Sequence, residues 1–554
     1  MATSYLSLTI DGQCIADVVL NHVSVTQELN HHWYCHAECR HTEEQRTTNV
    51  LATSLAEAGA QQSIVQVEDW LGKDLQVVSN DPEGDSVLFN GFVLEVELVY
   101  EPTGGYTALI QGVTYSYKMD LTPRHAYYQE KSLSDIANQL ASSAGLKATV
   151  QCQDGRPLNY VQWGESDFEF LRRLADDHGC WLRPAWDMTG QSQGPPSIEI
   201  YDSFQTGTSV AWRQDISGEP KLTSFSVKGT LSPSSFNGAH YDFHRMKSQT
   251  YTEVSDDAQF WGSLVDLVKA VKDGSKQVLA PGYLHHRARV VTLDDYEKAL
   301  KKESVRSIGS SVVGTGTSQN QKLLPGNEIK VSGVPDAEGT YGLTHVVHSW
   351  DPSGGYENQF SCTPWKNYTD PHPPEFKPWF GVVPARVVEH NDPKKMGRIK
   401  VQYFWQEDGA AYWARMITPH AGADRGFMFM PEVGDEVVVG FEDGDPERPV
   451  ILGCVWNGVD QAPRGPFRSD DIAPNDVKRI VTKSGNRLQM VDTPGKESIV
   501  MSTPNSVKVS LIEAGGSPTG RETLILQSET GDIILNAPNG RVHFHCKHFS
   551  REVG

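Results

Sequence analysis

The last thirty residues of the chain repeat every nine positions. Segments 522–528, 531–537 and 540–546 align, and alternate positions in each carry small or apolar side chains. Such alternation is typical of β-strands, and the dipeptides Thr-Gly at 530–531 and Asn-Gly at 539–540 are turn signals. Three short strands cannot bury one apolar stripe within a single chain, whereas identical copies around a symmetry axis can cover it. We therefore predict that the C-terminus is one strand of an intertwined, multi-chain β-prism, with a needle core formed by Leu524, Leu526, Ile533, Leu535, Val542 and Phe544.

Length and charge limit the alternatives. A chain of 554 residues is expected to form several domains, and its net charge of −21 argues against nucleic-acid binding. Eight scattered cysteines form no disulfide framework, so we expect reduced thiols in a protein made in the cytoplasm. No apolar run approaches the roughly 18 residues of a membrane span, and the first residues resemble no secretory signal. Any export is expected to proceed without a signal peptide.

The order of motifs predicts a mainly β fold with some α structure. Ser132 and Ser166, each followed three residues later by an acidic residue, are expected to cap two helices of the first domain. Two further helices are predicted at 256–273 and 293–302, with strands at 328–331 and 340–349. Five short strands after a Pro-rich joint fit a small closed barrel such as an OB-fold. The expected organisation is a hub at 1–370, a Pro-rich linker at 371–380, an OB-fold barrel at 381–458, a connector at 459–477 and a β-helix needle at 478–554.

Motifs in the barrel and the hub resemble those of VgrG-type spike proteins and the related phage tail hub-spike proteins. The barrel begins with HNDPKKMGRIKV at 390–401 and continues with GFMFMPEVGDEVVVGF at 426–441. In the hub, YVQWGESDFEFLRRL at 160–174 is similar to a motif of the same family. The remaining similar segments are 324–331, 339–341, 345–348, 413–419 and 444–453.

This resemblance implies a homotrimer whose C-terminal segments form an intertwined triple-stranded β-helix. Three hubs would match a hexameric tube ring, three barrels would form a collar beside other baseplate proteins, and three C-terminal segments would form the needle. A PAAR-type tip cap is expected to dock on the blunt end of the needle. Effectors would travel on the cap or in the tube, because no additional domain is expected, and contact with the target membrane would be transient. The residues expected to bind the cap are His548, Phe549, Val553 and Gly554.

Two histidine-rich segments are candidate metal sites. In segment 31–41, strand alternation places Cys35 and Cys39 on one face and His32 and His36 on the other, so these ligands cannot converge. We expect inward thiols and outward histidines instead. In the C-terminal repeat, His543 and His545 occupy outward positions of the predicted strand. Whether these two bind a metal on the trimer axis stays open, and no metal or cofactor is assigned.

No motif predicts a catalytic residue. We expect three pairs of adjacent aspartates, named at the end of this paragraph, to be solvated charges at helix ends. Turns of the barrel are expected at Gly434, Gly444, Pro446 and Gly453. The resulting hypothesis is a non-enzymatic spike that punctures a target envelope. The alternatives are a phage or prophage tail spike, a trimeric β-helix enzyme that cleaves polysaccharides, and an OB-fold that binds nucleic acid through Tyr403, Phe404 and Trp405. The acidic pairs are Asp176-Asp177, Asp256-Asp257 and Asp294-Asp295.

Overall fold

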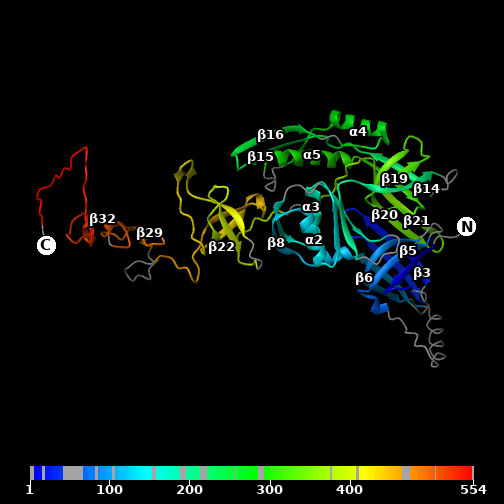
Figure 1. Ribbon diagram of the computed structural model, residues 1–554, viewed down its shortest axis with the longest axis horizontal. Helices are drawn as coiled ribbons and strands as arrows, with labels where there is room; N and C mark the ends of the chain where they lie inside the picture. Colours follow the sequence, from blue (N-terminus) through cyan, green and yellow to red (C-terminus); the bar gives the residue numbers. More distant parts are fainter. Residues whose placement is uncertain are drawn as a thin grey trace, which may run out of the picture. The chain divides into compact units, whose positions relative to one another are not determined.

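The computed structural model forms two compact units, Met1–Gly453 and Cys454–Gly554, and it is mainly β (Figure 1). Each unit is described separately below. The structure describes residues 5–551 except for 15–18, 42–66, 81–84, 101, 103–105, 153–156, 188–194, 213–220, 256–257, 285–291, 375–376, 407–410, 464–474 and 506.

The first unit is built on a 13-stranded sheet in the order β19-β13-β14-β18-β21-β20-β3-β4-β7-β6-β5-β1-β2, with β19 also paired to β20. Its N-terminal part buries one face, on which Val25, Cys35, Ala37 and Cys39 lie as strand alternation predicts. The strands are β1 (Tyr5–Ile10), β2 (Gln13–Cys14), β3 (Val19–Glu28), β4 (Tyr34–His41), β5 (Asp74–Asn80), β6 (Ser86–Tyr100), β7 (Tyr106–Thr114), β13 (Gln205–Trp212), β14 (Lys221–Gly229), β18 (Val312–Ser318), β19 (Asn327–Ser332), β20 (Gly339–Asp351) and β21 (Gly355–Thr363).

The part of this unit that contacts the barrel consists of two helices and the small sheets beside them. Helices α2 (Leu133–Ser143) and α3 (Asp167–Asp177) start at Ser132 and Ser166, and both capping boxes are present, which confirms the prediction. Their apolar faces share one core with the neighbouring strands. Those strands are β8 (Arg124–Lys131) paired with β10 (Leu158–Glu165), and β9 (Lys147–Gln151), β11 (Trp181–Ala185) and β12 (Ser197–Tyr201) in a three-stranded sheet.

The third and fourth helices differ from the prediction in their bounds. Helix α4 (Val265–Val278) begins later than expected, because Phe260 pairs in a β-bridge with Trp365 and Leu264 takes a left-handed φ of 57°. Tertiary pairing here outweighs the apolar periodicity that predicted a helix. Helix α5 (Leu293–Gly309) extends seven residues beyond the predicted end at 302. Helix α5 runs alongside the sheet of β15 (Phe236–Asp242), β16 (Lys247–Val254) and β17 (Gly282–Leu284), whereas α4 contacts β14 (Figure 1).

The predicted five-stranded barrel is confirmed. It closes in the order β22-β23-β24-β28-β27 around a buried apolar core. Gly434 and Gly444 have φ of 104° and 72° and serve turns, as expected, whereas Gly453 lies within β28, the strand that pairs with β24 through Val450 and Ile451. A short hairpin, β25 (Ala421–Gly422) with β26 (Arg425–Gly426), extends from it. The barrel strands are β22 (Val383–Glu389), β23 (Ile399–Tyr403), β24 (Tyr412–Met416), β27 (Glu436–Phe441) and β28 (Pro449–Cys454).

The second unit is a five-stranded antiparallel meander in which each strand pairs with the next along the chain. Its strands are β29 (Val477–Val481), β30 (Arg487–Val491), β31 (Ser498–Ser502), β32 (Lys508–Ile512) and β33 (Thr523–Gln527). Short 3-10 turns complete the described elements: η1 (Val67–Trp70), η2 (Tyr115–Met119), η3 (Glu442–Gly444) and η4 (Ala514–Gly516).

Candidate functional site

The meander of the second unit presents an apolar face that one chain leaves uncovered. Residues that are directly paired across strands lie on the same face of a sheet. The register aligns Ile480, Leu488, Met501, Val509 and Leu526 in one row. A second row contains Met490, Ile499, Leu511 and Leu524.

These rows form the apolar needle face, which we define by the residues of the two rows. Ile499, Met501, Leu511, Leu524 and Leu526 each leave between 44% and 60% of their surface exposed. Of the residues on this face, the sequence analysis selected only Leu524 and Leu526. Aligning the strands by their turns would have revealed the rest.

The C-terminal repeat differs from the predicted strands. Ile533, Leu535, Val542 and Phe544 are 48–65% exposed, and within the described residues up to Arg551 no strand follows β33. The predicted strands at 531–537 and 540–546 are therefore wrong for the isolated chain. The physical reason is that a strand needs a hydrogen-bonded neighbour, and this segment has none of its own.

The expected cap-binding residues lie in the same segment. His548 and Phe549 are exposed, and the Phe549 ring lies 5.8 Å from that of Phe544. Val553 and Gly554 lie outside the described residues. His543 and His545 are exposed as well, and nothing in the described part of the chain brings them together on a shared ligand.

The hub and the barrel share a core of aromatic side chains within the first unit. Trp163 of β10 lies 5.2–5.4 Å, centroid to centroid, from the rings of Trp379, Trp405 and Phe441. Val161 of the same strand belongs to the barrel's buried cluster. Aromatic pairs at such distances add to the stabilisation from burial, so this contact joins hub and barrel firmly.

These contacts bear on the nucleic-acid alternative. Tyr403 is buried in the barrel core, and Trp405 stacks on Tyr403 and contacts Trp163. Of the three aromatic residues considered as base-stacking groups, Phe404 alone is exposed above half of its surface. Tyr403 and Trp405 therefore serve packing.

A buried arginine reinforces the junction. The Arg173 guanidinium donates to both oxygens of Glu165, at 2.7 and 2.9 Å, and to the carbonyl of Val161 at 2.7 Å. Its third nitrogen lies 3.7 Å from Glu447 of the barrel. Because its side chain is 7% exposed, these charges attract one another in a poorly solvated site.

A second contact comes from the turn between β15 and β16. Phe243 lies between two barrel arginines, with Arg415 4.5 Å and Arg448 4.9 Å from its ring centroid. Both arginines also pair with Glu442. Two separate contacts, one from β10 and one from this turn, oppose rotation of the barrel against the hub.

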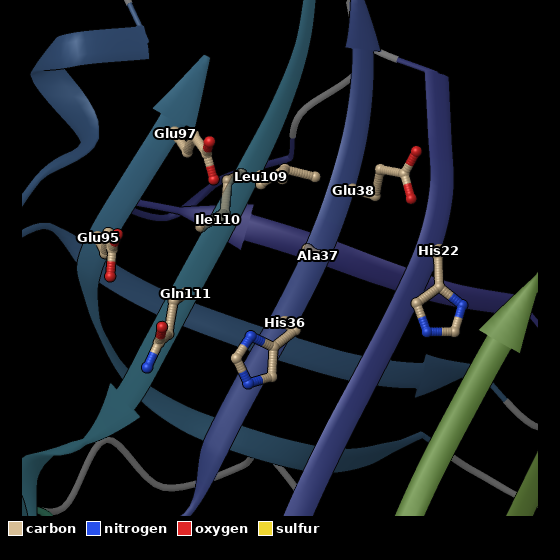
Figure 2. A pocket seen from close by; sticks show the side chains of 9 residues that line it. All are labelled: His22, His36, Ala37, Glu38, Glu95, Glu97, Leu109, Ile110 and Gln111. Carbon is tan, nitrogen blue, oxygen red and sulfur yellow. The ribbon is translucent and has the colours of Figure 1, made fainter. Parts of the chain in front are cut away.

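A shallow hollow lies on the outward face of the large sheet (Figure 2). Paired residues of β3, β4, β7 and β6 project into it, among them His22, His36, Glu38, Glu95 and Glu97. Among the residues that the structure describes, no group of three or more His, Cys, Asp or Glu side chains is arranged to hold a metal ion.

Residues 31–41 depart from the prediction at one position. Cys35 and Cys39 are buried, and burial raises the pKa of the Cys39 thiol to about 12, so it stays protonated. His32 was expected to face outward but is buried, because its ring contacts Phe168 at 3.8 Å and bonds to Ser116 at 2.8 Å. It precedes β4, so strand alternation does not apply to it.

The acidic pairs also require a correction. Asp176 was expected to be solvated, but it is buried and accepts from Arg306 at 2.6 Å and from Lys302 at 3.2 Å. It links α3 to α5 through these ion pairs. Asp294 and Asp295 lie in the first turn of α5, as expected, and Asp256-Asp257 lie outside the described residues.

None of the helices within the described ranges combines the length and apolar composition that crossing a membrane requires.

Comparison with curated proteins gives relatives of one kind. The type VI secretion system spike protein VgrG5 of Pseudomonas aeruginosa is 25% identical over 501 residues, covering 77% of this chain and 59% of that protein. VgrG1a of the same organism is 23% identical, covering 78% and 70%. The actin cross-linking toxin VgrG1 of Vibrio cholerae is 23% identical, covering 69% and 36%. The chain thus spans 59%, 44% and 36% of the first three relatives, VgrG5, VgrG4b and VgrG1.

Solved structures share the fold. The E. coli c3393 protein, a type VI secretion component, superposes with a TM-score of 0.52 at 16% identity, covering 81% of this chain and 99% of that one. A chain of the lidded Francisella PdpA–VgrG complex gives 0.59 at 9% identity, covering 95% and 81%.

Family profiles match both parts of the first unit. The type VI secretion system/phage-baseplate injector OB domain matches residues 383–456. The phage tail baseplate hub (GPD) profile matches residues 50–353, more than half of the chain. The resemblance to VgrG-type and phage hub-spike proteins is confirmed, and the chain belongs to the phage tail baseplate hub family.

Proposed function

We propose that three copies of this chain form the spike of a contractile injection machine, of the type VI secretion kind or a related one. The observation that carries this proposal is the apolar needle face, together with the exposed apolar repeat that follows it. Burying a large aliphatic side chain contributes about 1.5–3 kcal/mol of stabilisation, so covering the two exposed rows would strongly favour association of several copies. Copies wound around one axis would cover these rows and supply the missing strand partners of residues 528–551.

The proposed role is mechanical and not catalytic. Contraction of a sheath pushes the tube and hub forward, and the needle concentrates the force on a small area of the target envelope. Force must then pass from hub to barrel without rotation. The Trp163 core, the Arg173 network and the Phe243 contact support this role, because they join hub and barrel at separate points. Intertwined strands would resist unfolding because every edge has a partner.

The proposed partners follow from the same assembly. The hub would sit on a hexameric tube ring among baseplate proteins, and a PAAR-type cap would dock around His548, Phe549, Val553 and Gly554. Effectors would ride on the cap or in the tube, and contact with the target membrane would be transient. We propose no nucleic-acid partner and no cofactor. The protein would be assembled in the bacterial cytoplasm and injected without a signal peptide.

Electron microscopy of the purified full chain tests the proposal. The expected class averages are threefold-symmetric particles with a wide hub end and a thin needle. Particles of single-chain size, with hub and barrel but no needle, would contradict it. A variant with M490D on the apolar needle face should lose the needle, whereas Q489D on the opposite face should keep it.

A further inference from the structure

The turn between β15 and β16 carries a histidine to the joint between hub and barrel. The ring of His244 lies 4.1 Å, centroid to centroid, from the ring of Phe243. The same Phe243 ring is contacted by Arg415 and Arg448 of the barrel. An imidazole and two guanidinium groups therefore surround one aromatic ring. The charge of a histidine ordinarily changes at about pH 6.5, so the charge at this contact depends on mild acidity.

The turn holds this histidine in a defined position. The amide of His244 donates to one carboxylate oxygen of Asp242 at 2.9 Å, and Arg245 lies 3.7 Å from the other oxygen. Asp242 is buried, with 1% of its surface exposed, so its carboxylate anchors the turn from within. The imidazole therefore cannot move far from the barrel without breaking these contacts.

The charged groups that act on His244 are mostly cationic. On the barrel, Lys394, Arg398 and Arg448 disfavour a protonated imidazole. Asp242 of the hub favours it. Burial and the three cations together lower the pKa of His244 below its ordinary value, so the imidazole is neutral at pH 7 while the joint is closed. Other charged or titratable groups at this contact are Tyr241 and Arg245 of the hub and Arg415, Glu442, Asp443 and Asp445 of the barrel.

Positive charge is already crowded on the barrel side of the contact. Arg415 and Arg448 share the carboxylate of Glu442. Burial lowers the pKa of Arg415, and the neighbouring Arg448 lowers it further. A proton on His244 would add one more positive charge beside these two guanidinium groups, and in a partly solvated site such a charge repels them more strongly than it would in water.

We propose that segment 242–245 is a pH-sensitive latch between hub and barrel, closed while His244 is neutral and released when His244 binds a proton. The direction follows from linkage, because the imidazole binds a proton less readily in the closed joint than in the released one. The latch is therefore closed above the ordinary pKa of histidine and weakens as the pH falls through that value. In a mildly acidic compartment, the Trp163 core and the Arg173 network would still hold the barrel, which would gain freedom to rotate.

Single-molecule energy transfer across the joint tests this inference in the full chain. Two dyes, attached through unnatural amino acids, replace Met246 at the end of the turn and Met428 beside hairpin β25–β26, both 85% exposed. Labelled chains are assembled with a large excess of unlabelled ones, so that both dyes report on one copy. Lowering the pH from about 7.5 to about 5.5 leaves ordinary carboxylates ionised. It should increase the released population about twofold to fivefold, as expected for repulsion between partly exposed charges.

Three variants separate His244 from the other titratable groups. H244Q should keep the joint closed at both pH values, because glutamine binds no proton. H244K should release it at both, because lysine is already charged. H125Q is the matched control: His125 lies at the other hub–barrel contact, 4.6 Å from the Trp163 ring, and burial lowers its pKa as well. This variant should respond to pH as the original chain does.

The outcomes are distinct from those that bear on the needle. A pH response that survives in H244Q, or a response that disappears in H125Q, would overturn the latch. So would an H244K joint that stays closed at neutral pH, or equal transfer at both pH values in the original chain. None of these results would contradict the trimeric spike, because the latch is contained within one chain and association is measured separately by light scattering.

Discussion

Replacing Arg173 by methionine should loosen the barrel from the hub. The side chain is 7% exposed and makes hydrogen bonds to Glu165 and to the carbonyl of Val161, with Glu447 of the barrel nearby. Methionine keeps most of the volume but leaves the carboxylates of Glu165, Glu447 and Asp177 without this cation. The penalty arises mainly from these remaining charges, because water reaches them poorly.

The expected loss of stability is about 3–5 kcal/mol, which is typical when one partner of a buried ion pair is removed. The matched control is R124M. Arg124 makes a similar pair with Asp167, but its side chain is 44% exposed, so its loss should cost about 0–1 kcal/mol. Because the hub also has buried cores that contain no barrel residue, the Arg173 variant should release the barrel before the hub unfolds.

Urea denaturation combined with hydrogen exchange is the appropriate assay. In R173M, amides of the barrel strands that face β10 should exchange at least about a hundredfold faster than in R124M. A double-mutant cycle with E447Q should give a coupling energy of about 0.5–3 kcal/mol. Equal exchange in the two arginine variants, or a coupling near zero, would refute the claim that this network joins hub and barrel.

Three further predictions concern the barrel, the hub and the needle. G444A should lower the free energy of barrel unfolding by about 2–4 kcal/mol, because the φ of Gly444 is 72° and a Cβ would lie 2.7 Å from a neighbouring side chain. The control G397A should lower it by about 1 kcal/mol, because Gly397 has a similar φ of 71° but open space around its Cβ position. Burial lowers the pKa of His348 to about 3. As the pH falls, the unfolded state therefore binds the proton before the folded state does, and the free energy of unfolding should drop by on the order of 4 kcal/mol between pH 6.5 and pH 3. H348Q should flatten that part of the pH–stability curve, and an unchanged slope would contradict the assignment. M490D should abolish the association of copies measured by light scattering, whereas Q489D should preserve it. The same native mass for both variants would contradict the assignment of Met490 and Gln489 to opposite faces of the meander.

Local signals made parts of the fold predictable from sequence. Ser132 and Ser166 begin helices through contacts three residues away, so the pattern alone identifies both capping boxes. The barrel strands were predicted because apolar runs and turn residues alternate at short intervals.

Other features depend on contacts that no local pattern contains. Helix α4 begins only after Leu264 because the preceding segment pairs with Trp365, about a hundred residues away. Asp176 is buried by Arg306 of a distant helix, and His32 by Phe168. The C-terminal repeat shows the opposite case: its alternation predicts strands, but one chain supplies no neighbour for them.

The native mass of the purified protein, measured by light scattering, tests trimer formation through the needle most directly. A shortened chain that ends at Asn475 is measured in parallel. We expect a full-length trimer near three times 61.3 kDa, and loss of stable association when the meander and the repeat are removed. A full-length protein that stays monomeric at micromolar concentration would contradict the trimeric spike, because the apolar needle face would then be exposed without a partner.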